Sequence, residues 1–260
     1  MKHVYVIGGA GYIGSHVVRS LRLNSAFPEV IDLGIHGNVE APQDVRDMDP
    51  PDVPGVVLWL ASQHLEPAFL AENEKIEWQR YACDMEDAVE NWKAAGHDMV
   101  YASSMQVVAR PLSIYSRHKL EIERILLGKN GSVSIRLGTV YGGLNRDPCR
   151  PHTLPNRLLL ETALSGKWAR MREDVSTPMY WTTLGRAVGT LTGACLDPFS
   201  RTGQVVDASQ CVDYTSPGRH FNSEDFSISA ARVAVLRSLP HPTKLLAEKV
   251  GLPYPCPKQD

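Results

Sequence analysis

The chain has 260 residues, a formal net charge of −2 at pH 7 and a pI near 6.5. This length suits one α/β domain with a small second part. No dense block of lysine and arginine offers attraction to nucleic acid or an anionic membrane, and no apolar stretch has the length of a membrane span. Because the chain enters an apolar stretch without a signal-type leader, we expect a cytoplasmic protein with no nucleic-acid or membrane partner.

A short apolar stretch, a glycine turn and the start of a helix come first. Val4 to Ile7 predicts a strand, and Gly8, Gly11 and Gly14 follow it with G-x-x-G-x-x-G spacing. This spacing lets the backbone turn at Gly8, approach a pyrophosphate at Gly11 and pack helix on strand at Gly14. The N–H groups of the first helical turn then face the phosphates, so we predict a dinucleotide-binding turn.

A second apolar stretch ends in an acidic residue. Asp32 lies 18 positions after Gly14, close to the roughly 20 expected for a residue that accepts a ribose 2′-OH. The alternative is a turn residue or a helix cap. Only about ten residues separate Asp32 from Asp44, too few for a crossover helix with its loops, so we expect this edge of the sheet to be trimmed.

Strands and helices alternate through the rest of the chain, which predicts a doubly wound parallel sheet of the Rossmann-like α/β class. Further strands are predicted at 55–61, 99–102, 133–137 and 205–207, and helices at about 66–73, 77–95, 114–127, 156–165, 183–196, 224–239 and 243–250. The composition shifts to Pro, Arg and Asn beyond Tyr141. We therefore expect a dinucleotide-binding domain over 1–141, completed by about 183–206, and a small C-terminal substrate-binding annex over 142–182 and 207–260.

Tyr115 and Lys119 lie four positions apart on one predicted helix, so their side chains share a face. A lysine ammonium near a tyrosine hydroxyl favours the phenolate and lowers its pKa toward the range of a general acid/base. Ser104, at the end of a preceding strand, can hydrogen-bond the same substrate oxygen. Many helices carry such a pair by chance. What favours catalysis is the order: glycine turn, acidic strand tip, strand ending in Ser-Ser, then Tyr-x-x-x-Lys.

The chain resembles the extended short-chain dehydrogenase/reductases of the NAD-dependent epimerase/dehydratase family over roughly residues 1 to 205. The matching stretches are Gly8-Gly-Ala-Gly-Tyr-Ile-Gly14, Asp44-Val-Arg-Asp47, Trp59-Leu-Ala-Ser62, Tyr101-Ala-Ser-Ser104, Tyr115-Ser-Arg-His-Lys119 and Arg136-Leu-Gly-Thr-Val-Tyr-Gly142. The resemblance implies NAD as cofactor and Ser104, Tyr115 and Lys119 as catalytic residues.

The same resemblance implies two sets of binding residues. Expected cofactor contacts are Gly8, Gly11, Tyr12, Ile13, Gly14, Asp32, Asp44, Val45, Leu60, Ala61, Ser62, Tyr115 and Lys119. Expected substrate contacts are Ser104, Met105, Gln106 and Tyr141. The family's diphosphate-binding arginine is absent near Ser176 to Thr183, and we expect Arg172, or alternatively Arg170, to take its place. No metal site is predicted, because the five cysteines are scattered and the nine histidines show no paired spacing.

Two departures from the family narrow the expected reaction. Met105-Gln106 replaces the acidic pair with which family dehydratases eliminate water, so elimination is disfavoured. Tyr115 follows Ser104 by only eleven positions, which shortens a loop that helps to wall the substrate pocket in sugar-nucleotide 4-epimerases.

We therefore expect an NAD-dependent oxidoreductase or epimerase acting on a secondary hydroxyl or ketone of a sugar-like or sugar-nucleotide-like small molecule. The alternatives are an NAD(P)H-dependent ketoreductase of a small metabolite and, in a different class, a catalytically silent NAD-binding sensor or scaffold protein. The resemblance also implies a homodimer, in which the helices at 77–95 and 114–127 pair with their copies. Ile122, Ile125 and Leu126 offer an apolar face for this contact, although the same residues can instead cover the sheet.

Overall fold

The computed structural model describes residues 3–24, 30–33, 44–61, 72–109, 113–142, 179–197, 203–208 and 210–212. The chain divides into two compact units. Unit 1 comprises Met1–Gly138 and Arg186–Ser209, and unit 2 comprises Thr139–Gly185 and Gln210–Asp260. Unit 1 ends three residues before, and resumes three residues after, the boundaries expected at 141 and 183.

Unit 1 contains a six-stranded, fully parallel sheet with the strand order β2-β1-β3-β4-β5-β8. The strands are β1 His3–Ile7, β2 Val30–Leu33, β3 Gly55–Trp59, β4 Asp98–Ser104, β5 Ser132–Leu137 and β8 Gln204–Asp207. Among the described residues no strand lies beyond β2, in keeping with the trimmed edge. The doubly wound α/β fold predicted from the sequence is confirmed.

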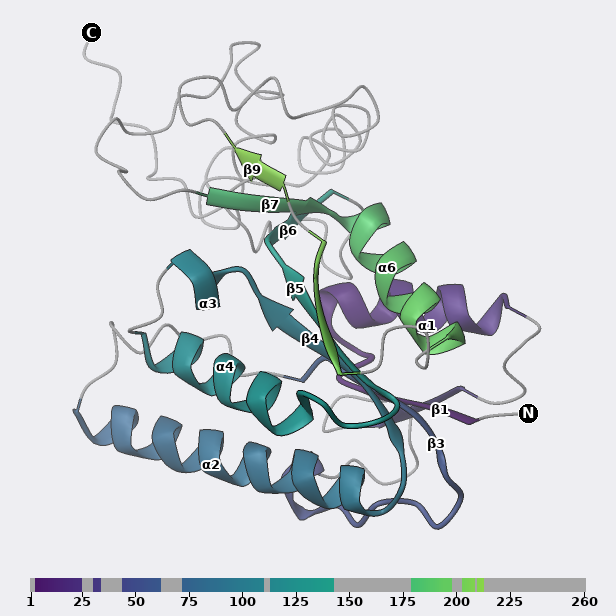
Figure 1. Ribbon diagram of the computed structural model, residues 1–260, viewed down its shortest axis with the longest axis horizontal. Coiled ribbons are helices and arrows are strands. Elements are labelled where there is room, and N and C mark those ends of the chain that lie inside the picture. The colour runs from purple at the N-terminus through teal and green to yellow at the C-terminus, as the bar shows by residue number, and fades with distance from the viewer. Residues whose placement is uncertain are drawn as a thin grey trace, which may run out of the picture. The chain divides into compact units, whose positions relative to one another are not determined.

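Helices cover both faces of this sheet (Figure 1). They are α1 Tyr12–Arg22, α2 Glu72–Ala94, α3 Gln106–Ala109, α4 Ile114–Leu126 and α6 Leu184–Leu196, with a short 3-10 turn, η1, at Val45–Asp47. Helices α2 and α4 lie side by side on one face, whereas α1 and α6 lie on the other. Glycines with positive φ follow α2 and α4, at Gly96 (+88°) and Gly128 (+71°), because a left-handed residue ends a helix with little strain there.

The core beneath α2 and α4 is rich in aromatic side chains. Trp59 and Trp92 are fully buried and meet edge to face, with ring centroids 6.2 Å apart. Ile122 and Leu126 belong to the same cluster, and Ile125 packs against it. The apolar face of α4 therefore packs largely within its own chain, the alternative that the sequence left open, and Ile125 stays half-buried.

Unit 2 contains a small three-stranded sheet in the order β6-β7-β9. Its strands are β6 Thr139–Tyr141, β7 Met179–Thr183 and β9 Gln210–Val212, with β6 parallel and β9 antiparallel to β7. Sequence patterns did not predict this sheet, because its strands are three to five residues long and carry no periodic signal of useful length.

Two helix predictions need comment. The sequence predicted two helices, at 66–73 and 77–95, with a break between them. The break is wrong, since α2 runs without interruption from Glu72 to Ala94. No glycine or proline interrupts 72–77, and nothing else there ends a helix. The helices expected at 156–165, 224–239 and 243–250 lie outside the described residues.

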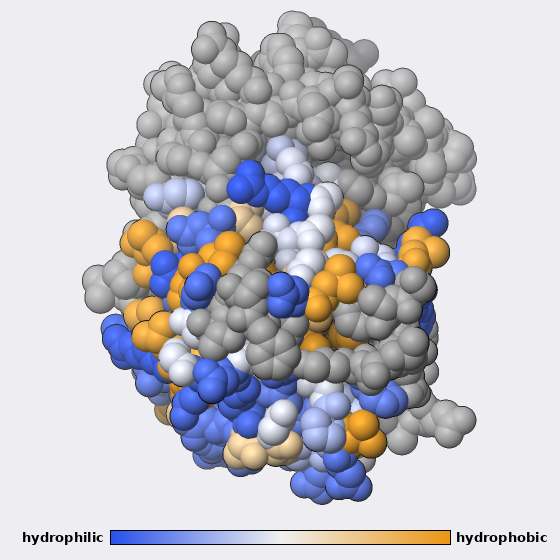
Figure 2. Space-filling view, turned by 45° about the vertical axis from the view of Figure 1, so that its right-hand side comes forward, coloured by the Kyte–Doolittle hydropathy of each residue, from blue (hydrophilic) through white to orange (hydrophobic). Residues whose placement is uncertain are grey.

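Among the described residues, few large apolar side chains are exposed. Figure 2 shows one face on which hydrophobic residues lie among hydrophilic ones. The large apolar side chains that are exposed come from different elements: Leu23, Val53, Ile76, Val108, Leu127 and Leu196. Within the described part of the chain, no helix is both long and apolar enough to cross a membrane.

Candidate active site

The glycine turn between β1 and α1 has no room for side chains. A Cβ atom added at Gly14 would lie 2.2 Å from the Gly8 carbonyl oxygen and 2.7 Å from the Gly9 Cα. At Gly8, where φ is +86°, it would lie 2.8 Å from the Ala61 backbone nitrogen. These backbones therefore touch directly, as the sequence spacing predicted for a close helix–strand packing.

The first turn of α1 is open to an anion. Its N-cap is Gly11, no side chain is hydrogen-bonded to the cap, and the turn contains no acidic residue. Backbone N–H groups at such a helix start lack internal partners and carry the positive end of the helix dipole. A dinucleotide pyrophosphate fits this arrangement of glycine backbone and free helix terminus.

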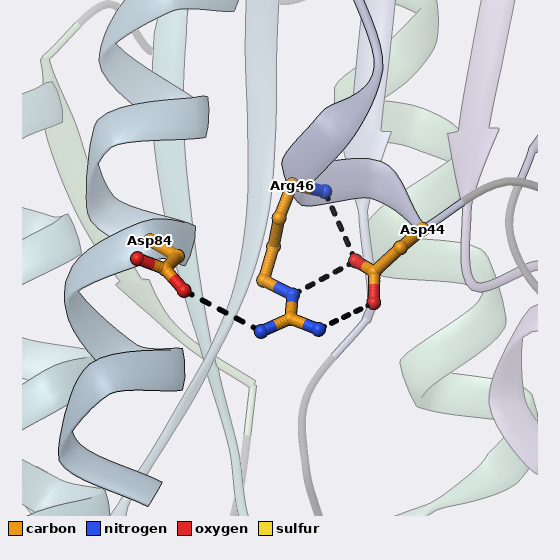
Figure 3. A network of polar contacts seen from close by, with 3 residues as sticks. All are labelled: Asp44, Arg46 and Asp84. Atoms are coloured by element: carbon orange, nitrogen blue, oxygen red, sulfur yellow. Dashed lines mark hydrogen bonds and ion pairs between the residues drawn. The ribbon is translucent and has the colours of Figure 1, made fainter. Parts of the chain in front are cut away.

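Asp44 begins η1 and is held by Arg46 (Figure 3). The Arg46 backbone N–H and Nε donate to Asp44 Oδ1 at 3.1 and 2.9 Å, and Nη2 donates to Oδ2 at 2.6 Å. Asp84 of α2 receives Nη1 at 3.5 Å, so the guanidinium links η1 to α2. The Arg46 hydrogen bond lowers the pKa of Asp44, and an ionised carboxylate can accept several hydrogen bonds, including one from a ligand.

Ser104 and Tyr115 come together at the carboxyl end of β4. The Ser113 hydroxyl caps α4 by accepting the Ser116 N–H at 3.0 Å, which places Tyr115 in the first turn. Ser104 Oγ accepts the Gln106 N–H at 3.2 Å, and the neighbouring Ser104 side chain lowers the pKa of Tyr115 in part. Both residues are partly exposed.

Lys119 lies one turn further along α4 and is only 3% exposed. Its Nζ donates to the Ala102 carbonyl at 3.0 Å and lies 4.7 Å from the ring centroid of Tyr101 and 5.7 Å from that of Tyr115. Burial lowers the pKa of Lys119 to about 7, while the negative charge of Glu123 raises it. The Tyr115–Lys119 adjacency inferred from the spacing is therefore present in the fold.

The expected net lowering of the Tyr115 pKa is wrong in direction. Burial raises the pKa of Tyr115 above its usual value of 10.0, and the neighbouring Ser104 side chain offsets only part of this rise. The physical reason is that a Tyr115 phenolate would lose hydration in this site. The Lys119 ammonium lies 5.7 Å from the Tyr115 ring centroid, and burial lowers the pKa of Lys119 itself. Tyr115 therefore holds its proton at neutral pH.

Three polar residues of β4, α4 and β5 received no role from the sequence: Ser103 and Glu123 are buried and Arg136 is half-buried. Ser103 Oγ donates to Glu123 Oε1 at 2.5 Å. Arg136 of β5 donates from Nε to Oε1 at 2.9 Å and from Nη2 to Oε2 at 2.6 Å. The available signal was Glu123 four positions after Lys119, which continues the face of Tyr115 and Lys119 along the helix.

The remaining predicted residues divide into three groups. Tyr12 and Ile13 begin α1, Asp32 lies in β2 opposite Val6, and Val45, Leu60 and Ala61 lie near the carboxyl ends of β1 and β3. Met105 is buried and Gln106 is exposed, both directly after β4. Tyr141 belongs to unit 2, where it is buried against Trp181 with ring centroids 5.8 Å apart.

Ser62 and Arg172 lie outside the described residues. Within the described ranges, no group of three His, Cys, Asp or Glu side chains is placed to hold a metal ion.

The chain is similar to known proteins in structure more than in sequence. No family model and no curated protein matches the sequence. Among solved structures, UDP-N-acetylglucosamine 4-epimerase from Methanobrevibacter ruminantium M1 in complex with UDP-N-acetylmuramic acid is similar, at 20% identity and a TM-score of 0.61, over 82% of this chain and 79% of that one.

Two further solved structures support the same likeness. UDP-glucuronic acid 4-epimerase from Bacillus cereus, in complex with UDP-glucuronic acid and NAD, shares 21% identity with a TM-score of 0.60, over 82% of this chain and 80% of that one. The Bordetella bronchiseptica enzyme WbmF, in complex with NAD+ and UDP, shares 15% identity with a TM-score of 0.62, over 95% and 96%. The chain therefore shares the fold of these solved structures, in agreement with the resemblance that its sequence shows.

Proposed function

We propose that the protein is an NAD-dependent oxidoreductase or epimerase that acts on a secondary hydroxyl or ketone of a sugar-like or sugar-nucleotide-like substrate. The observation that carries this proposal is the convergence of Ser104, Tyr115 and Lys119 at the carboxyl end of β4. The glycine turn follows β1 in the same parallel sheet, so cofactor and catalytic residues share one edge.

The geometry of the glycine turn supports a set of cofactor residues. Gly8, Gly11 and Gly14 would hold the pyrophosphate, because the turn packs tightly between β1 and α1 and the α1 terminus lacks a capping side chain. Asp44 would accept a hydrogen bond from the adenine end and Asp32 from the ribose. When bound, NAD supplies the acceptor and donor of hydride.

Tyr115 then moves the proton. Because its raised pKa keeps the phenol protonated, Tyr115 is poised to donate to an oxygen that becomes an alkoxide. Ser104 donates or accepts a second hydrogen bond at that oxygen, and Lys119 orients the pair from behind. In the reverse direction Tyr115 must first lose its proton, which makes abstraction from a hydroxyl the harder half of a redox-neutral cycle.

The protonated state of Tyr115 also favours a second candidate, a ketoreductase of a small metabolite, because carbonyl reduction requires Tyr115 only to donate its proton. The two functions differ in the fate of the hydride. An epimerase returns it to the same substrate and consumes no cofactor, whereas a reductase oxidises one NADH per turnover. We favour the epimerase, since Asp32 suits NAD and NAD suits a redox-neutral cycle.

The test is a substrate panel with cofactor accounting. The protein is incubated with NAD and UDP-sugars, and separately with NADH and cyclic ketones, while product and absorbance at the nicotinamide band are followed together. Epimer formation at constant NADH supports the epimerase, and stoichiometric loss of NADH with product supports the reductase. Tight NAD binding without turnover across the panel would instead support the alternative of a sensor or scaffold, and would overturn the enzyme.

We also propose a homodimer in the cytoplasm, on the likeness of fold alone. Helices α2 and α4 lie together on one face of the sheet, and the dimer would use their outward sides, since Ile122 and Leu126 are buried within the chain. Light scattering at micromolar concentration tests this, and a purely monomeric mass would refute it.

A further inference from the structure

The end of β4 and helix α4 are joined by three successive polar contacts, which we name the β4–α4 ladder. Two of its pairs are hydrogen bonds, the Ala102 carbonyl with Lys119 and Ser103 with Glu123. In the third pair, Ser104 lies beside Tyr115 and lowers its pKa in part. On α4 the three members are four residues apart and therefore lie along one face of the helix. On β4 they are consecutive residues. The ladder thus sets both the position and the rotation of α4 against the strand that carries Ser104.

Glu123 is the innermost member of the ladder and the most strongly held. Its side chain is 4% exposed, and its carboxylate accepts Ser103 Oγ and two donors of Arg136. Three hydrogen bonds, two of them from a bidentate guanidinium, offset the cost of removing the charge from water. Arg136 lies on β5, so Glu123 ties α4 to two neighbouring strands at once.

A merely structural contact at this position does not require charge. Apolar side chains of similar volume commonly replace a buried ion pair with equal or greater stability. The presence of a carboxylate one turn from Lys119 therefore points to a role for the charge itself. Among the described residues, the Lys119 ammonium donates to the Ala102 carbonyl and lies over the rings of Tyr101 and Tyr115.

Building on the function proposed above, we propose that Glu123, oriented by Arg136 and Ser103, is a positioning residue for the Tyr115–Lys119 pair. It fixes α4 on β4, and its negative charge keeps the buried Lys119 in the ammonium form. Burial lowers the pKa of Lys119 and the Glu123 charge raises it, and the two effects together leave this pKa at about 7. The charged and titratable groups around the ladder are Tyr101 on β4, Tyr115, His118 and Glu123 on α4, Glu86 on α2 and Arg136 on β5.

Glu123→Gln tests the charge while keeping the shape. Without the carboxylate, Lys119 loses its proton at lower pH, so the alkaline limit of kcat moves down and kcat at neutral pH falls by about tenfold to a hundredfold. The matched control is Glu121→Gln, the same change on the same helix in an exposed ion pair with Arg124, which should leave kcat and its pH profile unchanged. Glu123→Asp keeps the charge with a shorter reach and should restore the pH profile more fully than kcat.

A direct readout does not depend on turnover. Carbon-13 labelling at lysine Cε, assigned with Lys119→Met, reports the Lys119 titration by NMR in the protein without cofactor. A downward shift of that titration in Glu123→Gln, with none in Glu121→Gln, supports the ladder even if no substrate is turned over, in which case only the proposed function fails. An unchanged Lys119 titration in Glu123→Gln overturns the inference, whatever the activity.

The double variant Glu123→Met, Arg136→Met covers the case in which Glu123→Gln does not fold. Because both buried charges are removed together, no unpaired charge remains to unfold the chain. We expect the double variant to fold but to show a lowered Lys119 titration and a reduced kcat. A folded double variant in which the Lys119 titration and kcat equal those of the wild type would show that the ion pair only contributes packing. That result would overturn the proposal.

Discussion

The two halves of unit 1 build their parts of the site by opposite means. The β1–α1–β3 half builds its phosphate turn from backbone: Gly8 and Gly14 are glycines at which a Cβ would lie within 3 Å of neighbouring main chain. The β4–α4–β5 half uses side chains, with Lys119 and Glu123 each about 3% exposed and tied to neighbouring strands. The first half is therefore sensitive to added atoms, and the second to lost charges or donors.

The largest effect is expected from Tyr115→Phe in the second half. The substitution removes the acid/base and keeps the ring, so kcat should fall by about 10²-fold or more, while NAD binding changes little. Steady-state turnover and a cofactor titration measure the two separately. Activity that survives in this variant would remove Tyr115 from the mechanism.

Gly14→Ala should have the opposite profile. The new Cβ would lie 2.2 Å from the Gly8 carbonyl oxygen, and such overpacking costs about 1–3 kcal/mol, so NAD affinity should drop and the chain should be less stable. The control is Gly189→Ala in α6, where the added Cβ meets nothing within 4 Å and helix propensity favours alanine. Calorimetric titration of NAD and thermal melts compare the variants. Equal NAD affinity in both would contradict the assignment of the turn.

A smaller effect concerns the choice between cofactors in the first half. An acidic Asp32 accepts hydrogen bonds from a free ribose 2′-OH and repels a 2′-phosphate, and no arginine follows it before Arg46. NAD should therefore bind more tightly than NADP. In Asp32→Ala the affinities for NAD and NADP should differ less than in the wild type. Parallel titrations of the wild type and the variant measure it, and a preference for NADP in the wild type would exclude Asp32 as the selecting residue.

The smallest effect lies at the seam between the halves, at His97. Because Gly55 N–H donates to its Nδ1 at 3.2 Å, Nε2 carries the proton and donates to the Pro51 carbonyl at 3.1 Å. Burial lowers the pKa of His97 below 6.5. The folded state thus binds fewer protons than the unfolded state, so this contribution to stability is present above pH 6.5 and is lost as the pH falls below it.

His97→Gln keeps a donor and an acceptor without titrating near neutral pH. Its free energy of unfolding should therefore depend less steeply on pH than that of the wild type, by at most about 1.4 kcal/mol per pH unit below pH 6.5. Denaturant titrations at several pH values measure the two slopes. Identical slopes would show that His97 keeps an ordinary titration in the fold.

The difference between the halves also explains what sequence could predict. Glycine spacing and apolar runs are local signals, so the turn, β1, β3 and the Tyr115–Lys119 spacing were predicted and are present in the fold. Glu123 and Arg136 were not assigned a role, because charged residues in amphipathic patterns normally face water, and only tertiary pairing reveals their burial. The raised pKa of Tyr115 escaped prediction for the same reason, since desolvation depends on neighbours distant in sequence.

The place of β8 at the end of the sheet has a kinetic consequence. In the β5–β8 pair, Val133 is opposite Gln204, 71 positions later, so unit 1 closes only after the whole intervening segment of unit 2 has been synthesised. Such long-range parallel pairing slows folding and leaves a strand edge exposed meanwhile. During synthesis, at elongation rates of about 5–20 residues per second, the edge of β5 that pairs with β8 therefore stays unpaired for several seconds. Chains truncated before residue 204 should accordingly depend on chaperones to remain soluble.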